Sequence, residues 1–195
     1  MDQPPGRRLP VPPLSEEEHR LALSLIRRAV ELFVREGRQL EPGDSTPSFS
    51  RRQGVFVTLT VPEGLRGCVG TVESPGPLSE TLVHCAIAAA TKDTRFAPVS
   101  EAELPRLRYE VSILSDLQRA DSPDELQVGT HGVLVESGSR RGLLLPQVAV
   151  AHRWDRETFL DQVCIKAGLP AGAWRSGAAL WLFTAEVFGE EIPEP

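Results

Sequence analysis

Residues 54–72, GVFVTLTVPEGLRGCVGTV, decide the fold of this chain. From residue 55 to residue 61, aliphatic residues alternate with Phe or Thr, and this period of two predicts a strand with one buried face. The Pro-Glu-Gly at residues 62–64 predicts a turn. Residues 65–72 are then expected to form the partner strand, so the stretch predicts a β-hairpin.

The second strand of this hairpin carries the motif Leu65-Arg66-Gly67-Cys68-Val69-Gly70. Glycine permits tight turns and close approaches that other residues cannot make, so we expect the thiol to lie on a glycine-bracketed turn. A guanidinium beside the thiol, here that of Arg66, favours the reactive thiolate. Cys68 is therefore a candidate nucleophile, redox-active thiol or metal ligand. The alternative is a small apolar side chain packed in a strand, because free cysteine is among the most buried residue types.

Two long helices are predicted, one on each side of the hairpin in the sequence. The first begins at a capping box formed by Ser15 and Glu18 and ends near Gly37. Its expected buried face consists of apolar residues at helical spacing: Leu21, Leu25, Ala29, Leu32 and Phe33. The second is an alanine-rich helix near residues 78–91.

The rest of the chain mixes helices and strands without a regular βαβ rhythm. The expected elements are helices that begin after Ser100 and Asp155 and strands at residues 108–114, 132–136, 142–145 and 179–188. This order favours an α+β fold, with a mixed or antiparallel sheet flanked by helices, over a doubly wound sheet.

Three further positions carry polar groups of chemical interest. His131 precedes a glycine at a loop-to-strand junction, and histidine suits general acid–base work because it titrates near neutral pH; an exposed loop histidine is the alternative. Asp93 and Arg95 flank one residue of a turn, a spacing that sets an Asx-type turn or presents a guanidinium to an anion. Gln147 follows an apolar strand, where a buried amide orients a ligand or fixes the backbone.

Other kinds of site have less support. Cys85 and Cys164 lie on predicted helices and are expected to be packing residues. No C-x-x-C, H-x-x-x-H or carboxylate–histidine spacing predicts a zinc site. The glycines match neither a nucleotide-binding loop nor a nucleophile elbow. The sequence therefore predicts no metal and leaves the question of a cofactor open.

The composition is that of a globular protein, with 195 residues, 41% hydrophobic and 25% charged. A formal net charge of −6 argues against a nucleic-acid partner. No apolar run reaches the roughly 20 residues that cross a membrane, and no signal-peptide core is present, so we expect a cytoplasmic protein. Residues 1–14 hold five of the seventeen prolines and are expected to form a flexible arm before a domain at 15–190 and a tail at 191–195.

Taken together, these segments resemble the AMMECR domain family from about residue 15 to residue 190. The resemblance rests on blocks that follow one another in the family's order: GVFVTL (54–59), LRGCVGT (65–71), DTRF (93–96), EVSIL (110–114), HG (131–132), GLLLPQVA (142–149), WD (154–155) and CIKAGLP (164–170). The ordered succession of the blocks is highly specific, although each alone is weak.

The resemblance implies an α+β fold of two intimately packed subdomains, with the glycine–cysteine motif lining a cleft between them. It places the candidate catalytic residues Cys68 and His131, and the candidate binding residues Arg66, Gly67, Gly70, Asp93, Arg95 and Gln147, within or beside matching blocks. It also implies association with Memo-like and radical-SAM proteins in a modification pathway. The sequence departs from the family at Val69, usually isoleucine, and at Ala151, commonly glutamate, so no catalytic role is assigned near Ala151.

Two functions are compatible with this pattern. In the first, the protein is an enzyme or enzyme component in which Cys68 reacts. Arg66 then favours the thiolate or holds an anionic substrate group, and His131 moves a proton. In the second, the protein is a non-catalytic binding or adaptor module that presents the surface from Arg66 to Gly70.

Overall fold

The structure, a computed structural model, describes residues 12–43, 46–74 and 76–190. Most of the expected arm, residues 1–11, and the expected tail, residues 191–195, lie outside the described residues. Within the described part, no helix is long and apolar enough to span a membrane. The chain divides into two compact units: the first extends to Val111 and resumes at Phe188, and the second is Ser112–Val187.

The first helix of unit 1, α1, covers Glu16–Glu36 and confirms both predicted ends. The Ser15 side chain accepts from the Glu18 backbone and Gly37 closes the helix in the left-handed region at φ 68°. The expected buried face is correct in part: Ala29 is buried and Leu25 and Phe33 pack against the core, but Leu21 is 45% exposed. The fully buried side chains are Ala22, Ile26, Ala29 and Val30. The helix carries two overlapping apolar stripes, and only packing chooses between them.

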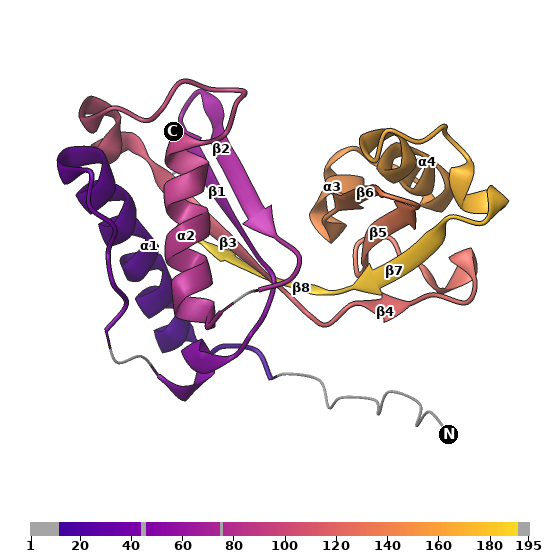
Figure 1. Ribbon diagram of the computed structural model, residues 1–195, viewed down its shortest axis with the longest axis horizontal. Coiled ribbons are helices and arrows are strands. Elements are labelled where there is room, and N and C mark those ends of the chain that lie inside the picture. The colour runs from indigo at the N-terminus through magenta and orange to yellow at the C-terminus, as the bar shows by residue number, and fades with distance from the viewer. Residues whose placement is uncertain (1–11, 44–45, 75, 191–195) are drawn as a thin grey trace. The chain divides into compact units, whose positions relative to one another are not determined.

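The predicted hairpin is present in unit 1 as β1 (Val55–Val61) and β2 (Gly64–Thr71), paired antiparallel. The sheet has the order β2-β1-β3-β8, where β3 is Arg108–Leu114 and β8 is Ala185–Gly189. Helix α2 (Leu78–Thr91) packs beside α1, and contacts β1 and β2 (Figure 1). Short 3-10 turns, η1 (Pro47–Ser50) and η2 (Glu101–Arg106), complete this unit.

The glycines around Cys68 serve close packing in a strand, which corrects the expectation of a tight turn. A Cβ on Gly67 would lie 2.2 Å from the Ala89 carbonyl oxygen of α2. A Cβ on Gly70 would lie 2.4 Å from the ring of Phe56 on β1. Neither glycine has a positive φ. The small side chain is needed because a helix and an aromatic ring lie directly against the strand.

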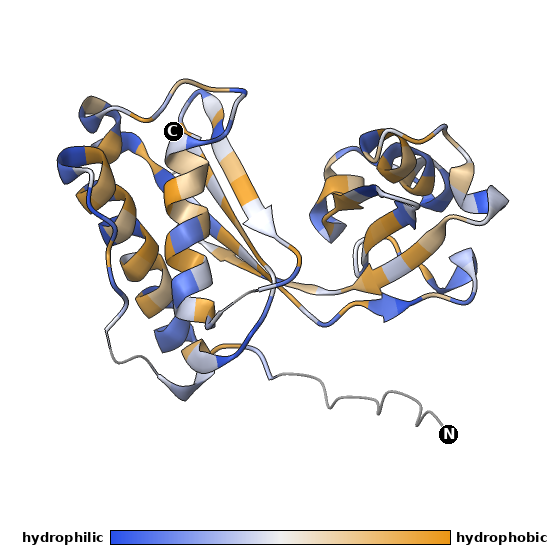
Figure 2. Cartoon of the chain, in the orientation of Figure 1, coloured by the Kyte–Doolittle hydropathy of each residue, from blue (hydrophilic) through white to orange (hydrophobic). Residues whose placement is uncertain are grey.

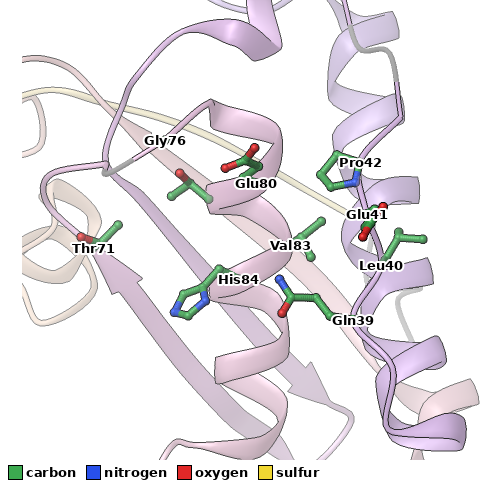
Figure 3. A pocket seen from close by; sticks show the side chains of 10 residues that line it. Gln39, Leu40, Glu41, Pro42, Thr71, Gly76, Glu80, Val83 and His84 are labelled. Carbon is green, nitrogen blue, oxygen red and sulfur yellow. The ribbon is translucent and has the colours of Figure 1, made fainter.

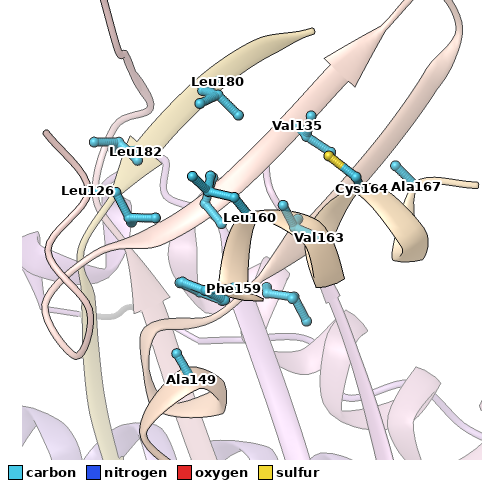
Figure 4. Packing of buried hydrophobic residues seen from close by; sticks show 12 residues of the cluster. Leu126, Val135, Ala149, Phe159, Leu160, Val163, Cys164, Ala167, Leu180 and Leu182 are labelled. Carbon is cyan, nitrogen blue, oxygen red and sulfur yellow. The ribbon is translucent and has the colours of Figure 1, made fainter. Parts of the chain in front are cut away.

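Unit 2 holds the second sheet, with the order β4-β7-β5-β6. Its strands are β4 (Gln118–Arg119), β5 (Gly132–Ser137), β6 (Arg140–Leu144) and β7 (Ala179–Phe183), and its helices and turns are η3 (Pro123–Glu125), α3 (Pro146–Ala151), α4 (Arg156–Lys166) and η4 (Ala173–Ser176). Asp155 caps α4, as predicted, by accepting from the Thr158 backbone. Figure 4 shows Phe159, Leu160 and Val163 of α4 packed against the sheet, with Cys164 among them.

The predicted last strand, residues 179–188, is in fact two strands. Strand β7 belongs to the sheet of unit 2, and strand β8 belongs to the sheet of β1 and β2. Between the two strands, Thr184 is hydrogen-bonded to Ser115. The Ser115 N–H donates to the Thr184 carbonyl oxygen, and the Thr184 N–H donates to Ser115 Oγ, each at 2.9 Å. Both β7 and β8 contain hydrophobic residues (Figure 2), and no Gly or Pro marks the change of sheet, so the sequence predicts one apolar strand. The two mixed helix-and-sheet units confirm the predicted α+β fold.

Candidate functional site

Cys68 lies on β2 with its side chain on the face of the sheet turned away from α2. The register pairs Cys68 with Thr58, and the neighbours of Thr58 on β1, Val57 and Leu59, are fully buried on the other face. The Thr58 hydroxyl is 3.4 Å from Cys68 Sγ and donates to it. As a residue Cys68 is half-buried, unlike the two other cysteines, which are buried.

Asp93 fixes the backbone at Cys68. Strand β2 is at the edge of its sheet, and the outward Cys68 N–H donates to Asp93 Oδ2 at 2.8 Å. The predicted Asx-type turn is present, because the Arg95 N–H donates to Asp93 Oδ1. The Arg95 side chain adds two more bonds, from Nε at 2.9 Å and from Nη2 at 2.6 Å. These bonds from Arg95 are the main reason that the pKa of Asp93 lies well below its ordinary value.

Arg66 is bound by a second carboxylate. The register of β1 and β2 shifts beside Arg66, which re-aims its side chain in the manner of a β-bulge. Its Nε and Nη2 donate to the two oxygens of Glu103 at 2.6 and 3.2 Å. These bonds, together with those from Ser100, lower the pKa of Glu103 to about 2. The direct effect of the Arg66 charge on the thiol stays a prediction, because the guanidinium is paired with Glu103.

Phe96 lies beside both arginines. The Cζ atoms of Arg66 and Arg95 are 5.9 and 5.5 Å from the centre of its ring. Residues 93–103 therefore run along the edge of β2. The Arg66–Glu103 pair and the bond from the Cys68 N–H to Asp93 join them to the strand. Covering an edge strand in this way prevents unwanted strand pairing and holds the cysteine backbone in place.

The structure places the other two predicted site residues in unit 2. His131 precedes β5, and its Nδ1 accepts from the Gln127 N–H at 3.2 Å, which closes a short turn. Gln147 is the second residue of α3, a helix that the sequence did not reveal, and its Nε2 donates to Ser112 Oγ at 3.2 Å. Gln147 also lines a cavity of about 350 Å³ together with Ala151. Thus Arg66, Gly67, Cys68, Gly70, Asp93 and Arg95 lie together in unit 1, and His131 and Gln147 lie in the other unit.

Glu110 is a titratable group that the sequence reasoning missed. Its neighbours on β3, Tyr109 and Val111, are buried, and the Tyr109 ring packs under Arg27 of α1 at 4.6 Å. Glu110 therefore points to the opposite face of the sheet, the face that carries Thr58 and Cys68. Burial raises its pKa. The detectable signal was the alternation of residues 108–114, RYEVSIL, which places Glu110 on the face opposite Tyr109 and Val111.

The other two cysteines are core residues, as predicted. The Cys85 thiol on α2 is 3.7 Å from the Val55 carbonyl oxygen, and burial is the main cause that raises its pKa to about 11. Burial also raises the pKa of Cys164 on α4. A thiol whose ionised form is disfavoured by burial is a poor nucleophile, so neither suits chemistry.

A larger cavity of about 760 Å³ lies in unit 1 at the N-terminal half of α2 (Figure 3). Its walls include Glu80 and His84 of α2, Gln39 and Leu40 from the loop after α1, and Thr71 at the end of β2. Among the residues that the structure describes, no group of three or more His, Cys, Asp or Glu side chains is arranged to hold a metal ion.

The fold and the site define a class: an α+β protein of two four-stranded sheets, with a half-buried thiol fixed on an edge strand by an aspartate. The chain belongs to the AMMECR1 family, whose model matches residues 23–188.

Relatives and a solved structure agree with this assignment over almost the whole length. A protein of Thermofilum pendens is 43% identical over 199 residues, covering 93% of each chain. A protein of Thermococcus kodakarensis is 43% identical over 192 residues, covering 92% of this chain and 94% of that one. The crystal structure of an uncharacterized protein from Pyrococcus horikoshii is similar with a TM-score of 0.88 and 38% identity, covering 92% of this chain and 95% of that one.

Proposed function

We propose that this protein is a cytoplasmic enzyme, or a component of one, that uses the Cys68 thiolate as a nucleophile. The observation that carries the proposal is the bond from the Cys68 N–H to Asp93, which fixes the strand at the half-buried thiol. The Thr58 hydroxyl supports it, because a charge-assisted hydrogen bond to a sulfur anion is stronger than the bond to the neutral thiol.

In this proposal each residue around the sulfur has a separate task. Cys68 attacks the substrate, Thr58 orients Sγ, and Asp93 positions the backbone. Arg66 and Arg95 secure the residues that cover the edge of β2. The roles of His131 as a proton carrier and of Gln147 as a binding residue stay predictions from the sequence.

Alkylation of the native protein tests the proposal. Iodoacetamide is added in small excess, samples are quenched over time, and each cysteine is followed by mass spectrometry of its peptide. We expect Cys68 to react much faster than Cys85 and Cys164, because burial disfavours the thiolates of both core cysteines. Labelling of Cys68 at the rate of Cys164 would overturn the proposal. The Cys68→Ser variant serves as the control for peptide assignment.

The second function, a binding or adaptor module, has less support from the packing. The positions of Gly67 and Gly70 are closed by the Ala89 carbonyl and the Phe56 ring. In that function, Cys68→Ser keeps partner binding and Arg66→Ala loses it. Retention of binding by Arg66→Ala would exclude this version of the module.

Membership in the family supports a further part of the proposal, that the protein acts with Memo-like and radical-SAM proteins in a modification pathway. Purified proteins of these two kinds from one organism should bind the chain directly in a titration calorimetry experiment. The Cys68→Ser variant should bind equally well, since the thiol is assigned to chemistry. Absence of heat for either protein would remove it as a partner.

A further inference from the structure

Two guanidinium groups lie beside the ring of Phe96. Arg66 and Arg95 approach Phe96 with Cζ atoms 5.9 and 5.5 Å from the ring centre. The Arg66 side chain is 13% exposed and that of Arg95 is 55% exposed, so Arg95 is the outer group of the pair. Such an arrangement holds both planes in fixed orientations before any ligand arrives.

Each guanidinium has hydrogen-bond donors beyond those that bind its carboxylate. In the described part of the chain, Arg66 bonds Glu103 through Nε and Nη2, and Arg95 bonds Asp93 through the same two atoms. The Nη1 groups take part in neither pair. An arginine presents five N–H donors in a rigid fork, and its planar edge matches a carboxylate or a phosphate.

The donors of Arg95 lie close to the reactive group. One carboxylate, that of Asp93, accepts both from the Cys68 N–H at 2.8 Å and from Arg95 Nη2 at 2.6 Å. The guanidinium of Arg95 is therefore one carboxylate away from the cysteine backbone. The pKa of Arg95 is raised, first by its bonds to Asp93, and the charge interaction with Cys68 contributes in the same direction.

We propose that the substrate of the Cys68 site carries an anionic group, a carboxylate or a phosphate, which binds the outer donors of Arg95, with Arg66 behind it. This inference rests on the proposed function, since it concerns the substrate of the same thiol. The two arginines are balanced in charge by Asp93 and Glu103. The attraction is therefore short-ranged and directional, and selects an anion that reaches the guanidinium edge.

Two alkylating reagents of nearly equal size test the proposal. Iodoacetate carries a carboxylate where iodoacetamide carries a neutral amide. In both reactions the Cys68 thiolate attacks the methylene carbon, a C–S bond forms, the C–I bond breaks and iodide leaves with the electron pair. The measured quantity is the ratio of the iodoacetate rate to the iodoacetamide rate at Cys68, compared with the same ratio for glutathione.

The expected ratio at Cys68 exceeds that of glutathione by up to about fivefold, the scale of an exposed ion pair. Arg95→Gln should return the ratio to the glutathione value. The ratio is the readout because a general change in the reactivity of the thiol alters both rates equally. Arg106→Gln is the matched control, because Arg106 has a similar exposure of 52% and pairs with Glu63 at the hairpin turn. Inorganic phosphate should slow the reaction of Cys68 with iodoacetate more than its reaction with iodoacetamide. Sodium chloride at equal ionic strength should have a smaller effect on the iodoacetate reaction.

The outcomes separate the two proposals. If both reagents label Cys68 fast and the ratio of their rates equals that of glutathione, the proposal of an anionic substrate is overturned and the proposal of a nucleophilic thiol stands. An equal loss of preference in Arg95→Gln and Arg106→Gln also overturns it, because the effect is then one of net charge. Slow labelling of Cys68 by both reagents overturns the proposed function, and the substrate inference with it.

Discussion

Cys68 of unit 1 and Cys164 of unit 2 show how differently the two units use the same side chain. Both units have helices packed against a four-stranded sheet. Cys164 lies on the sheet-facing side of α4, fully buried among aliphatic residues (Figure 4). Cys68 lies on the sheet face opposite α2, half-buried, next to a hydroxyl and a carboxylate-bound backbone.

The difference teaches that the face of the sheet decides the surroundings of the thiol. On the helix side, burial disfavours the thiolate and the sulfur acts as a small apolar atom. On the other side, polar neighbours and solvent keep the sulfur available. The predictions below test each half of this comparison.

The largest effect is expected in the core that surrounds Cys164. Phe159→Ala should lower the free energy of unfolding by about 3–5 kcal/mol, because it removes a fully buried ring. All three tryptophans lie in unit 2, so urea unfolding followed by tryptophan fluorescence reports on that unit. Ile165→Ala, at a position 52% exposed on the same helix, is the control and should stay within about 0.5 kcal/mol. Equal losses would contradict the assignment of the core.

A second large effect is expected where β2 meets α2. Gly67→Ala places a Cβ against the Ala89 carbonyl and should cost about 3 kcal/mol, since backbone must move. The loss should appear in far-UV circular dichroism during unfolding, while the tryptophan transition of unit 2 stays in place. Gly43→Ala, with nothing within 4 Å of the new Cβ, should be nearly neutral. An unchanged dichroism midpoint in Gly67→Ala would show that the strand and helix are not in close contact.

An acid dependence is expected from the Arg66–Glu103 pair. The pKa of Glu103 is lowered from 4.5 to about 2, so the pair stabilises the fold fully above pH 4.5 and the contribution is lost as the pH falls toward 2. Glu103→Gln should therefore be less stable than the parent protein near neutral pH, and the difference should shrink to nothing in acid. Urea unfolding across this pH range measures it. Parallel curves for the two proteins would contradict the pairing.

The smallest effect is expected on the alkylation rate of Cys68 when the hydroxyl of Thr58 is removed. Thr58→Val keeps the shape of the side chain and removes the donor to Cys68 Sγ. We expect alkylation of Cys68 at neutral pH to slow about threefold, the scale of one hydrogen bond. Thr58→Ser restores the hydroxyl and should restore the rate. Equal rates in the valine and serine variants, whatever their value, would show that the hydroxyl does not act on the sulfur.

Part of the candidate site follows from the sequence, where its contacts join residues that are close together in the chain. The Asx turn of Asp93 and Arg95 and the hairpin that carries Cys68 are set by local patterns. The sequence could not show that Asp93 reaches the Cys68 N–H or that Glu103 binds Arg66. Those contacts span 25 and 37 residues. Glu110 was missed for the same reason, because only the folded sheet places it on the same face as Thr58 of β1 and Cys68 of β2.

The sequence by itself determined the elements whose causes are local: the capping box at Ser15, the stop at Gly37, the cap at Asp155 and the period-two hairpin. Only the tertiary structure decided which stripe of α1 is buried, why Gly67 and Gly70 are glycines, and that residues 179–188 divide between two sheets. The physical reason is the range of the interactions. Hydrogen bonds within one turn and side-chain periodicity act between near neighbours in the sequence. Close packing depends on which distant segments are in contact in the folded protein.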